Sequence, residues 1–130
     1  RATNLSESSC LRRVRQLEAE GVIQGYAAIV AQERVGLSLN VFVTITLTSQ
    51  SDAALKEFEQ AVGEIEEVME CFLMTGTADY LIRLTARDVN DLEQLHAKKL
   101  TRLPNVARVT SSIAMRKVVR RMDLPIRDIT

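Results

Sequence analysis

The residues best suited to bind a small charged ligand lie near the middle of the chain, between two apolar runs. Residues 75–79, Thr-Gly-Thr-Ala-Asp, separate the runs 68–74 and 80–86, a pattern typical of a β-hairpin with its turn at Gly76. Glycine permits a positive φ and leaves the neighbouring backbone amides uncovered, so a ligand carboxylate can approach them. Asp79 adds an acceptor for a ligand ammonium. The alternative interpretation is that Gly76 and Asp79 are ordinary turn residues.

Two hydroxyl side chains lie on a second apolar run, residues 106–119. Thr110 and Ser112 are two positions apart, so they share one face if this run is a strand. Such hydroxyls can hydrogen-bond to a ligand or lie in an interface between subunits.

The sequence offers little for catalysis or for a metal. His96 is the only histidine, and Cys10 and Cys71 have no CxxC spacing. No Ser/His/Asp set and no phosphate-binding glycine loop can be assembled, so we expect no metal, no cofactor and no enzymatic activity. No apolar run is long enough to cross a bilayer and the chain has no signal-like start, which predicts a cytoplasmic protein without a membrane partner.

The net charge of zero hides a strong asymmetry along the chain. Residues 50–94 contain eleven acidic and three basic residues, whereas residues 95–130 contain nine basic and two acidic residues. Such a distribution is compatible with a surface that faces nucleic acid and with self-association through complementary charges, and the sequence does not decide between them.

The elements from Leu39 onward follow the order strand, helix, strand, strand, helix, strand. Apolar residues alternate in 41–47, a helix starts near residues 49–52, and after the hairpin Asn90 is the expected cap of a second helix that ends at Pro104. Residues 106–119 form the last expected strand. This order predicts an α+β, ferredoxin-like βαββαβ domain with both helices on one face of the sheet. The uncovered face then invites a second copy of the chain.

The beginning of the chain predicts a basic helix followed by an extended linker. Ser6 is the expected N-cap, Gly21 the expected stop, and Cys10, Val14 and Leu17 form an apolar stripe. The remaining surface is basic and hydrogen-bonding, which suits a DNA major groove as well as an ordinary solvated helix. Residues 22–31 read as a strand or linker strand, and residues 32–38 as a helical turn and loop.

Several motifs in this order resemble the Lrp/AsnC family, the leucine-responsive or feast/famine transcription regulators of prokaryotes. The matching segments are LSESSCLRRVRQLEAEGVIQGYAA, FVTITL, EEVMECFLMTGTADYLIRL and LPNVARVTSSIAMRKVV, which cover about residues 4–126. The resemblance implies a partial helix-turn-helix in residues 1–21, a linker in 22–36 and an effector-binding, oligomerising domain in 37–130. It also implies double-stranded DNA and an amino-acid effector as partners, and dimers that assemble into tetramers or octamers.

The resemblance also implies two sets of site residues. The effector would be held between dimers by Thr75, Gly76, Thr77, Asp79, Tyr80, Thr110 and Ser112, although Tyr80 is equally suited to packing inside the sheet. DNA would be contacted by Ser6, Ser8, Ser9, Arg12, Arg13 and Gln16. The family has two further helices before this recognition helix, so the helix-turn-helix is expected to be incomplete here. Either the parent polypeptide is longer, or the protein is a stand-alone amino-acid-sensing module that has lost its DNA reader.

Overall fold

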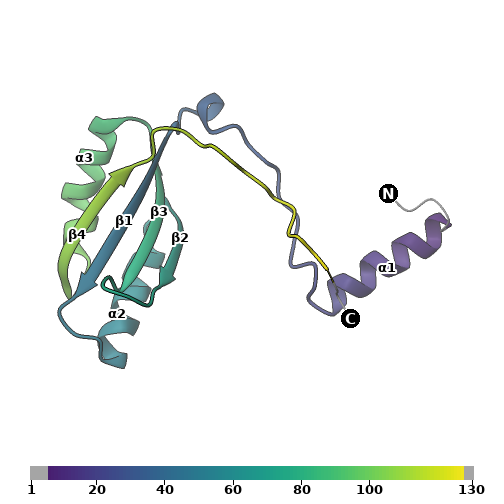
Figure 1. Ribbon diagram of the computed structural model, residues 1–130, viewed down its shortest axis with the longest axis horizontal. Coiled ribbons are helices and arrows are strands. Elements are labelled where there is room, and N and C mark those ends of the chain that lie inside the picture. The colour runs from purple at the N-terminus through teal and green to yellow at the C-terminus, as the bar shows by residue number, and fades with distance from the viewer. Residues whose placement is uncertain (1–5, 128–130) are drawn as a thin grey trace. The chain divides into compact units, whose positions relative to one another are not determined.

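The computed structural model describes residues 6–127, and the chain divides into two compact units between Val30 and Ala31. The larger unit, residues 31–130, contains the predicted ferredoxin-like βαββαβ domain (Figure 1). Its elements in order are η1 (Gln32–Val35), β1 (Leu39–Leu47), α2 (Asp52–Gly63), β2 (Val68–Leu73), β3 (Tyr80–Ala86), α3 (Val89–Lys98), η2 (Leu100–Arg102) and β4 (Val106–Ile113). The predicted fold class is confirmed.

The four strands form one antiparallel sheet in the order β2-β3-β1-β4. Ile45 of β1 pairs with Tyr80 of β3, and Leu47 pairs with Val106 of β4. The end of β1, the turn between β2 and β3 and the start of β4 therefore lie at the same end of the sheet. These three segments are close in space although they are far apart in the sequence.

The core lies between one face of the sheet and the two helices α2 and α3. Alternate residues of β1 and β3 point into it, which is the two-residue period expected of strands. Figure 1 shows both helices on the same side of the sheet. The buried core consists of Val41, Val43, Ile45, Leu47, Phe58, Val62, Ile65, Tyr80, Ile82, Leu84, Ala86, Leu92, Leu95, Leu100 and Leu103.

The start of α3 differs from the sequence prediction. Its N-cap is Asp88, whose Oδ1 accepts a hydrogen bond from the Asp91 amide at 2.8 Å. The expected cap, Asn90, is the second residue inside the helix. A carboxylate and an amide are both good N-caps, so the local sequence alone does not choose between the two positions.

Two predicted strands are shorter or less regular than expected. β4 ends at Ile113, opposite Val41 of β1, and not at Val119. The Ala114 amide donates to the Asn40 carbonyl at 2.9 Å, and residues 115–127 are not in a helix or strand. Residues 24–31 are likewise extended without forming a strand, since nothing in the described part of this single chain pairs with them.

The smaller unit contains α1 (Glu7–Ala19), whose predicted boundaries are confirmed. Ser6 is the N-cap, and its Oγ accepts from the Ser9 amide at 3.2 Å. Gly21 has a φ of 81°, the left-handed conformation that ends many helices. The linker begins directly after this turn and is attached to the helix by the hydroxyl of Tyr26, which donates to Glu18 at 2.6 Å.

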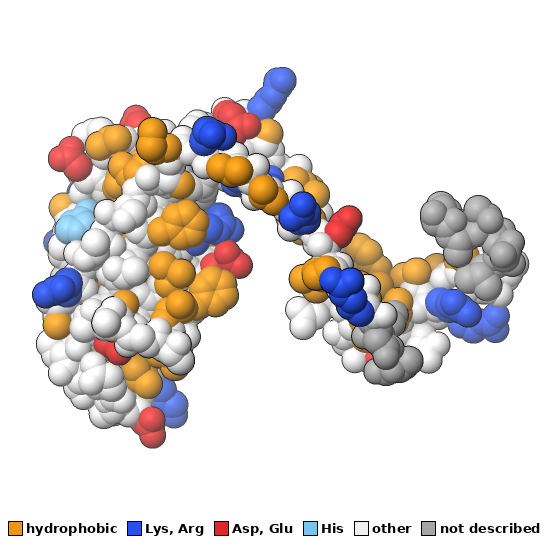
Figure 2. Space-filling view, viewed as in Figure 1, with side chains coloured by type: hydrophobic (Ala, Val, Ile, Leu, Met, Phe, Trp, Pro, Cys, Tyr) orange, Lys and Arg blue, Asp and Glu red, His pale blue; other side chains and the backbone are white. Residues whose placement is uncertain are grey.

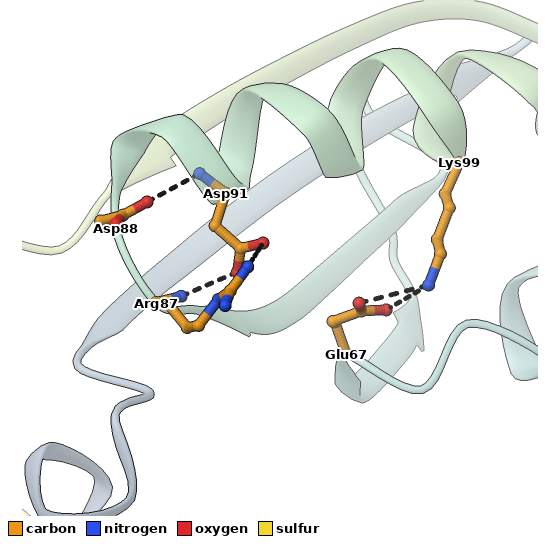
Figure 3. Close-up of polar contacts among 5 residues, drawn as sticks. All are labelled: Glu67, Arg87, Asp88, Asp91 and Lys99. Atoms are coloured by element: carbon orange, nitrogen blue, oxygen red, sulfur yellow. Dashed lines mark hydrogen bonds and ion pairs between the residues drawn. The ribbon is translucent and has the colours of Figure 1, made fainter.

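Polar contacts fasten α3 to the sheet at both ends (Figure 3). At its start, Asp91 accepts from the Arg87 backbone amide at 2.9 Å and from the Arg87 guanidinium at 3.3 Å, which lowers the pKa of Asp91 below 3.8. At its end, Lys99 forms an ion pair with Glu67 at 2.8 Å, and this carboxylate raises the pKa of Lys99. These contacts hold the helix over the sheet where its apolar side chains are few.

Protonation of Asp91 should weaken the fold. A carboxyl group with a lowered pKa in the folded state stabilises the fold above its ordinary pKa of 3.8, and this stabilisation disappears as the pH falls through the lowered value. Asp91→Asn should therefore lower the urea midpoint at about pH 7 and leave it equal to that of the parent at about pH 2. The control Asp123→Asn, in the exposed segment after β4, should match the parent at both pH values. A constant gap between Asp91→Asn and the parent would contradict this role.

Candidate functional site

The turn between β2 and β3 exposes its backbone, as the sequence predicted. Gly76 has a φ of 108°, a conformation that side chains other than glycine rarely adopt. Thr75, Gly76 and Thr77 are all exposed, and a Cβ built on Gly76 would meet no atom within 4 Å. The Met74 amide donates to the Asp79 carbonyl at 2.9 Å and closes the turn. The amides of the turn are thus free of steric cover from this chain.

Asp79 lies at the base of the turn and is already engaged in the fold. One carboxylate oxygen, Oδ2, accepts from the Leu47 amide at 2.7 Å and from Nε2 of Gln50 at 3.2 Å. The Asp79 amide donates to the Ile45 carbonyl at 2.8 Å. The sequence identified Asp79 as a possible ammonium acceptor but gave no sign of Leu47 or Gln50, which lie about thirty residues earlier.

The amide of Thr48, directly after β1, is bound by the turn before β4. Thr48 donates its amide to the Asn105 carbonyl at 2.8 Å, and the Asn105 side chain donates to Glu57 of α2 at 2.9 Å. Asn105 has a φ of 63°, which asparagine tolerates better than most residues. The connection from β1 to α2 is therefore held between the hairpin turn and the turn before β4.

Tyr80 lies on the other side of the sheet from the hydroxyl pair. Its side chain is only 1% exposed, stacks on Phe58 with ring centroids 4.5 Å apart, and donates its hydroxyl to Glu59 at 2.5 Å. Burial, followed by the hydrogen bond to Glu59, raises the pKa of Tyr80. The Tyr80 side chain therefore lies inside the core and not at the surface of the turn. Tyr80 instead anchors the first residue of β3 to α2.

Thr110 and Ser112 lie on the open face of the sheet, opposite to the helices. Thr110 pairs with Thr44 and Ser112 with Phe42, and both hydroxyl residues are exposed on the edge strand β4. Paired residues of neighbouring strands share a face. β1 separates the edge strand β4 from β3, so in one copy the hydroxyls and the hairpin turn lie on strands that are not adjacent.

The open face carries large apolar side chains that the sequence did not indicate as site residues. Phe42 is 38% exposed and Phe72 is 47% exposed. Phe72 pairs with Leu81 of β3, whereas Phe42 pairs with Arg83 of the same strand. Figure 2 shows apolar side chains gathered over the sheet on the side away from the helices. Arg83 and Glu70 form an ion pair at 3.0 Å on the same face. The period of two along each strand is the signal that would have placed these residues together.

Four of the six candidate DNA-binding residues, Ser6, Ser8, Ser9 and Arg12, are joined by hydrogen bonds at the start of α1. The Ser6 hydroxyl donates to Ser9 at 3.0 Å and lies 3.3 Å from the Ser8 hydroxyl, and the Arg12 guanidinium donates to Ser9 at 3.3 Å. Gln16 donates to Glu20 at 3.0 Å. Arg13 is exposed on the same helix. These bonds are all to neighbours on α1, so they preorganise the helix surface locally.

The opposite surface of α1 is apolar and uncovered. No residue of this helix is buried, and Leu11 is 50% exposed. A shallow depression is lined by Glu7, Ser8, Cys10, Leu11 and Val14. A solvated apolar stripe of this kind is what a helix presents when it normally packs on other helices.

The cysteines and the acidic residues show no arrangement for chemistry. Burial raises the pKa of the Cys71 thiol to about 11, so it stays protonated and unreactive at neutral pH. Among residues 6–127, no three side chains of His, Cys, Asp or Glu lie close enough to hold a metal ion. In the same part of the chain, no helix has the length and the apolar character needed to cross a membrane.

The sequence matches two known families in the parts that the two units occupy. Residues 40–124 match the family described as the Lrp/AsnC ligand binding domain. Residues 1–24 match a family of winged helix-turn-helix DNA-binding segments. The first match covers most of the larger unit, including the hairpin turn, Thr110 and Ser112.

Characterised and uncharacterised transcription regulators are similar over most of the chain. An HTH-type transcriptional regulator of Sinorhizobium fredii is 40% identical over 88% of this chain and 91% of its own length. The Bkd operon transcriptional regulator of Pseudomonas aeruginosa is 38% identical over 94% of this chain and 80% of its own. The leucine-responsive regulatory protein of Escherichia coli K12 is 39% identical over 88% of this chain and 70% of its own.

Solved structures of the same class share the fold. A transcriptional regulator of Neisseria meningitidis in complex with L-Met has a TM-score of 0.87 and 32% identity, over 93% of this chain and 78% of its own. A feast or famine regulatory protein of Mycobacterium tuberculosis, complexed with L-methionine, has a TM-score of 0.76 and 34% identity, over 92% and 79%. The relatives are transcription regulators and not enzymes. On the sheet topology, the hairpin and these matches, the chain belongs to the Lrp/AsnC family of transcription regulators.

Proposed function

We propose that this protein is a DNA-binding regulator that acts in the cytoplasm and whose larger unit binds an amino-acid effector between copies of itself. Effector binding changes how the copies assemble and thereby alters the engagement of DNA. The observation that carries this proposal is that the two polar groups of residues, the hairpin turn and the hydroxyls of β4, lie apart on one copy, so a second copy is needed to bring them together. The turn at Thr75, Gly76, Thr77 and Asp79 lies at the end of the sheet, and the hydroxyls lie on the edge strand β4.

The turn has the groups that a zwitterion needs. Exposed amides around Gly76 suit the effector carboxylate, and Asp79 suits its ammonium. Two relatives at 32% and 34% identity were solved with L-methionine bound, which supports an amino acid as the ligand class. Thr110 and Ser112 of another copy would supply hydroxyls, and Tyr80 would support the turn from inside the core.

Self-association follows from the open face. Phe72 of β2 pairs with Leu81 of β3, and Phe42 of β1 lies diagonally across from Leu81 on the same face. Exposed apolar groups of this kind on small domains are usually found at interfaces. The edge strand β4 carries hydroxyls in place of these apolar groups. Contact between two apolar patches would therefore leave the β4 edge and the hairpin turn for further copies, as a tetramer or octamer requires.

DNA engagement is supported by α1. Arg12 and Arg13 lie with the serines on an exposed, capped helix, and this segment matches a winged helix-turn-helix family. Arginines and hydroxyls are the groups that most often contact DNA phosphates and guanine. The uncovered stripe on the other side of α1 suits packing against additional helices, which would fix the helix in a groove.

The assembly can be tested with a charge on the open face. Phe42→Lys should raise the dissociation constant of the dimer by about 100-fold or more, because burying an unpaired ammonium costs several kcal/mol. Light scattering and sedimentation at micromolar concentration would measure it. The control Val89→Lys places the same charge on an exposed apolar position at the start of α3 and should leave the assembly unchanged. A monomeric parent protein, or an unaffected Phe42→Lys dimer, would contradict the proposed interface.

The effector site can be tested by calorimetry with the proteinogenic amino acids, beginning with L-methionine. The parent protein should bind at least one of them. Gly76→Val should weaken that binding more than tenfold, because a Cβ disfavours the positive φ and obstructs amide contacts worth about 1.5–3 kcal/mol each. The control Gly25→Val changes an open position of ordinary φ in the linker. No binding of any amino acid by the oligomer would contradict the proposed effector class.

DNA binding can be tested through its salt dependence. The 130-residue chain should bind duplex DNA weakly and with little sequence preference, and its affinity should fall steeply with salt. Arg12→Ala should reduce the slope of log affinity against log salt by about 0.9, the value for one lost phosphate contact. Arg102→Ala, on η2 of the larger unit, is the control and should not change the slope. Tight sequence-selective binding by this chain at physiological salt would show that α1 needs no further helices.

A further inference from the structure

Gln50 connects two segments that the sequence keeps far apart. Its Nε2 donates to the Leu47 carbonyl at 3.2 Å and to Oδ2 of Asp79 at 3.2 Å. Gln50 lies in the connection from β1 to α2, directly before the helix cap Ser51. Its side chain therefore links the end of β1 to the base of the hairpin turn, although neither the sequence pattern nor the family resemblance assigned it a role.

The two oxygens of the Asp79 carboxylate have different surroundings. Oδ2 accepts from the Leu47 amide at 2.7 Å and from Gln50, so its two lone-pair directions are both used. No hydrogen bond to Oδ1 is found within residues 6–127. A planar carboxylate whose one oxygen is held from two directions has a fixed orientation. The other oxygen then points in a defined direction and remains available as an acceptor.

We infer that Gln50 is a positioning residue for recognition of the effector ammonium. By binding Oδ2 of Asp79, Gln50 orients the carboxylate so that Oδ1 accepts a hydrogen bond from the ammonium. This inference rests on the proposed amino-acid function and specifies which side of the zwitterion the Asp79 end of the turn recognises. The ligand class is accordingly a compound with a free, protonated amino group. N-acylated amino acids and 2-oxo acids, which lack that ammonium, are excluded.

The amide side chain of Gln50 is suited to bind Oδ2 of Asp79 while Oδ1 is left for the ligand. A neutral amide donor satisfies Oδ2 and leaves the negative charge of Asp79 intact for a cationic ligand. A lysine at the same place would also donate to Oδ2, but its charge would compete with the effector ammonium. Loss of the side chain would free the carboxylate to rotate, since only the Leu47 amide would still hold it.

The positioning role predicts that the affinity for L-methionine decreases from the parent to Gln50→Ala and further to Gln50→Lys. A residue that only stabilised the fold would not produce this order. Gln50→Ala should weaken L-methionine binding about 2–10-fold, the range for one lost hydrogen bond. Gln50→Lys should weaken it further, by more than about tenfold, since about 1.5–3 kcal/mol is expected for a bond to a charged group. The thermal midpoint of Gln50→Lys without ligand should equal or exceed that of the parent, because an ion pair with Asp79 replaces a neutral bond.

The experiment is calorimetric titration of the full chain with L-methionine and with N-acetyl-L-methionine, together with thermal melts without ligand. The controls Gln60→Ala and Gln60→Lys make the same changes at an exposed position on α2. They should bind L-methionine as the parent does. The parent should discriminate strongly against the N-acetyl compound, and both Gln50 variants should lose part of that discrimination.

The outcomes separate this inference from the function on which it rests. If no amino acid binds the parent protein, the proposed function falls and this inference falls with it. If L-methionine binds but the Gln50 variants bind it as tightly as the parent, only the positioning role is overturned. Equal binding of N-acetyl-L-methionine by the parent would overturn the assignment of Oδ1 to the ammonium. If both Gln50 variants bind L-methionine more weakly and also have a lower thermal midpoint without ligand, Gln50 stabilises the fold and does not position Asp79 for the ligand.

Discussion

The structure of the larger unit depends on the fact that only one face of its sheet is covered. Helices α2 and α3 bury alternate residues of β1 and β3, and no other described element of the larger unit covers the opposite face. Apolar side chains on a wet sheet face carry a free-energy penalty that association can remove. The ferredoxin-like topology thus implies a partner surface, and it also decides which polar residues lie outside that surface, on the edge strand and at the hairpin turn.

A second constraint acts where β1 leaves the sheet. Leu47 lies beyond the last residue pair between β1 and β3, which is Ile45 with Tyr80, and Thr48 lies beyond the end of β1. Asp79 accepts from the Leu47 amide and the Asn105 carbonyl from the Thr48 amide. Satisfying both donors avoids the cost of unpaired backbone groups and joins three turns into one rigid end. A binding site at this end would lose little conformational entropy when a ligand arrives, because its polar groups are already held.

Much of this fold could be predicted from local patterns. The alternation in residues 41–47, the hairpin around Gly76 and the cap at Ser6 each depend on residues close together in the chain, so periodicity and side-chain type suffice. The helix α1 is the clearest case, since its cap and the hydrogen bonds of Ser9 and Arg12 join residues three positions apart. The same local reasoning identified the turn and the two hydroxyls of β4 as candidate site residues, and the resemblance supplied the family.

The sequence by itself therefore determined the element order, the hairpin turn and the polar residue types of the candidate site. Only the tertiary structure decided that Tyr80 turns into the core, that β4 stops at Ile113, and that Gln50 holds one oxygen of Asp79. Each of these outcomes depends on a partner that is distant in the sequence, such as Glu59 for Tyr80. Contacts of this kind arise from the register between strands and from helix packing, for which a single sequence has no local signal.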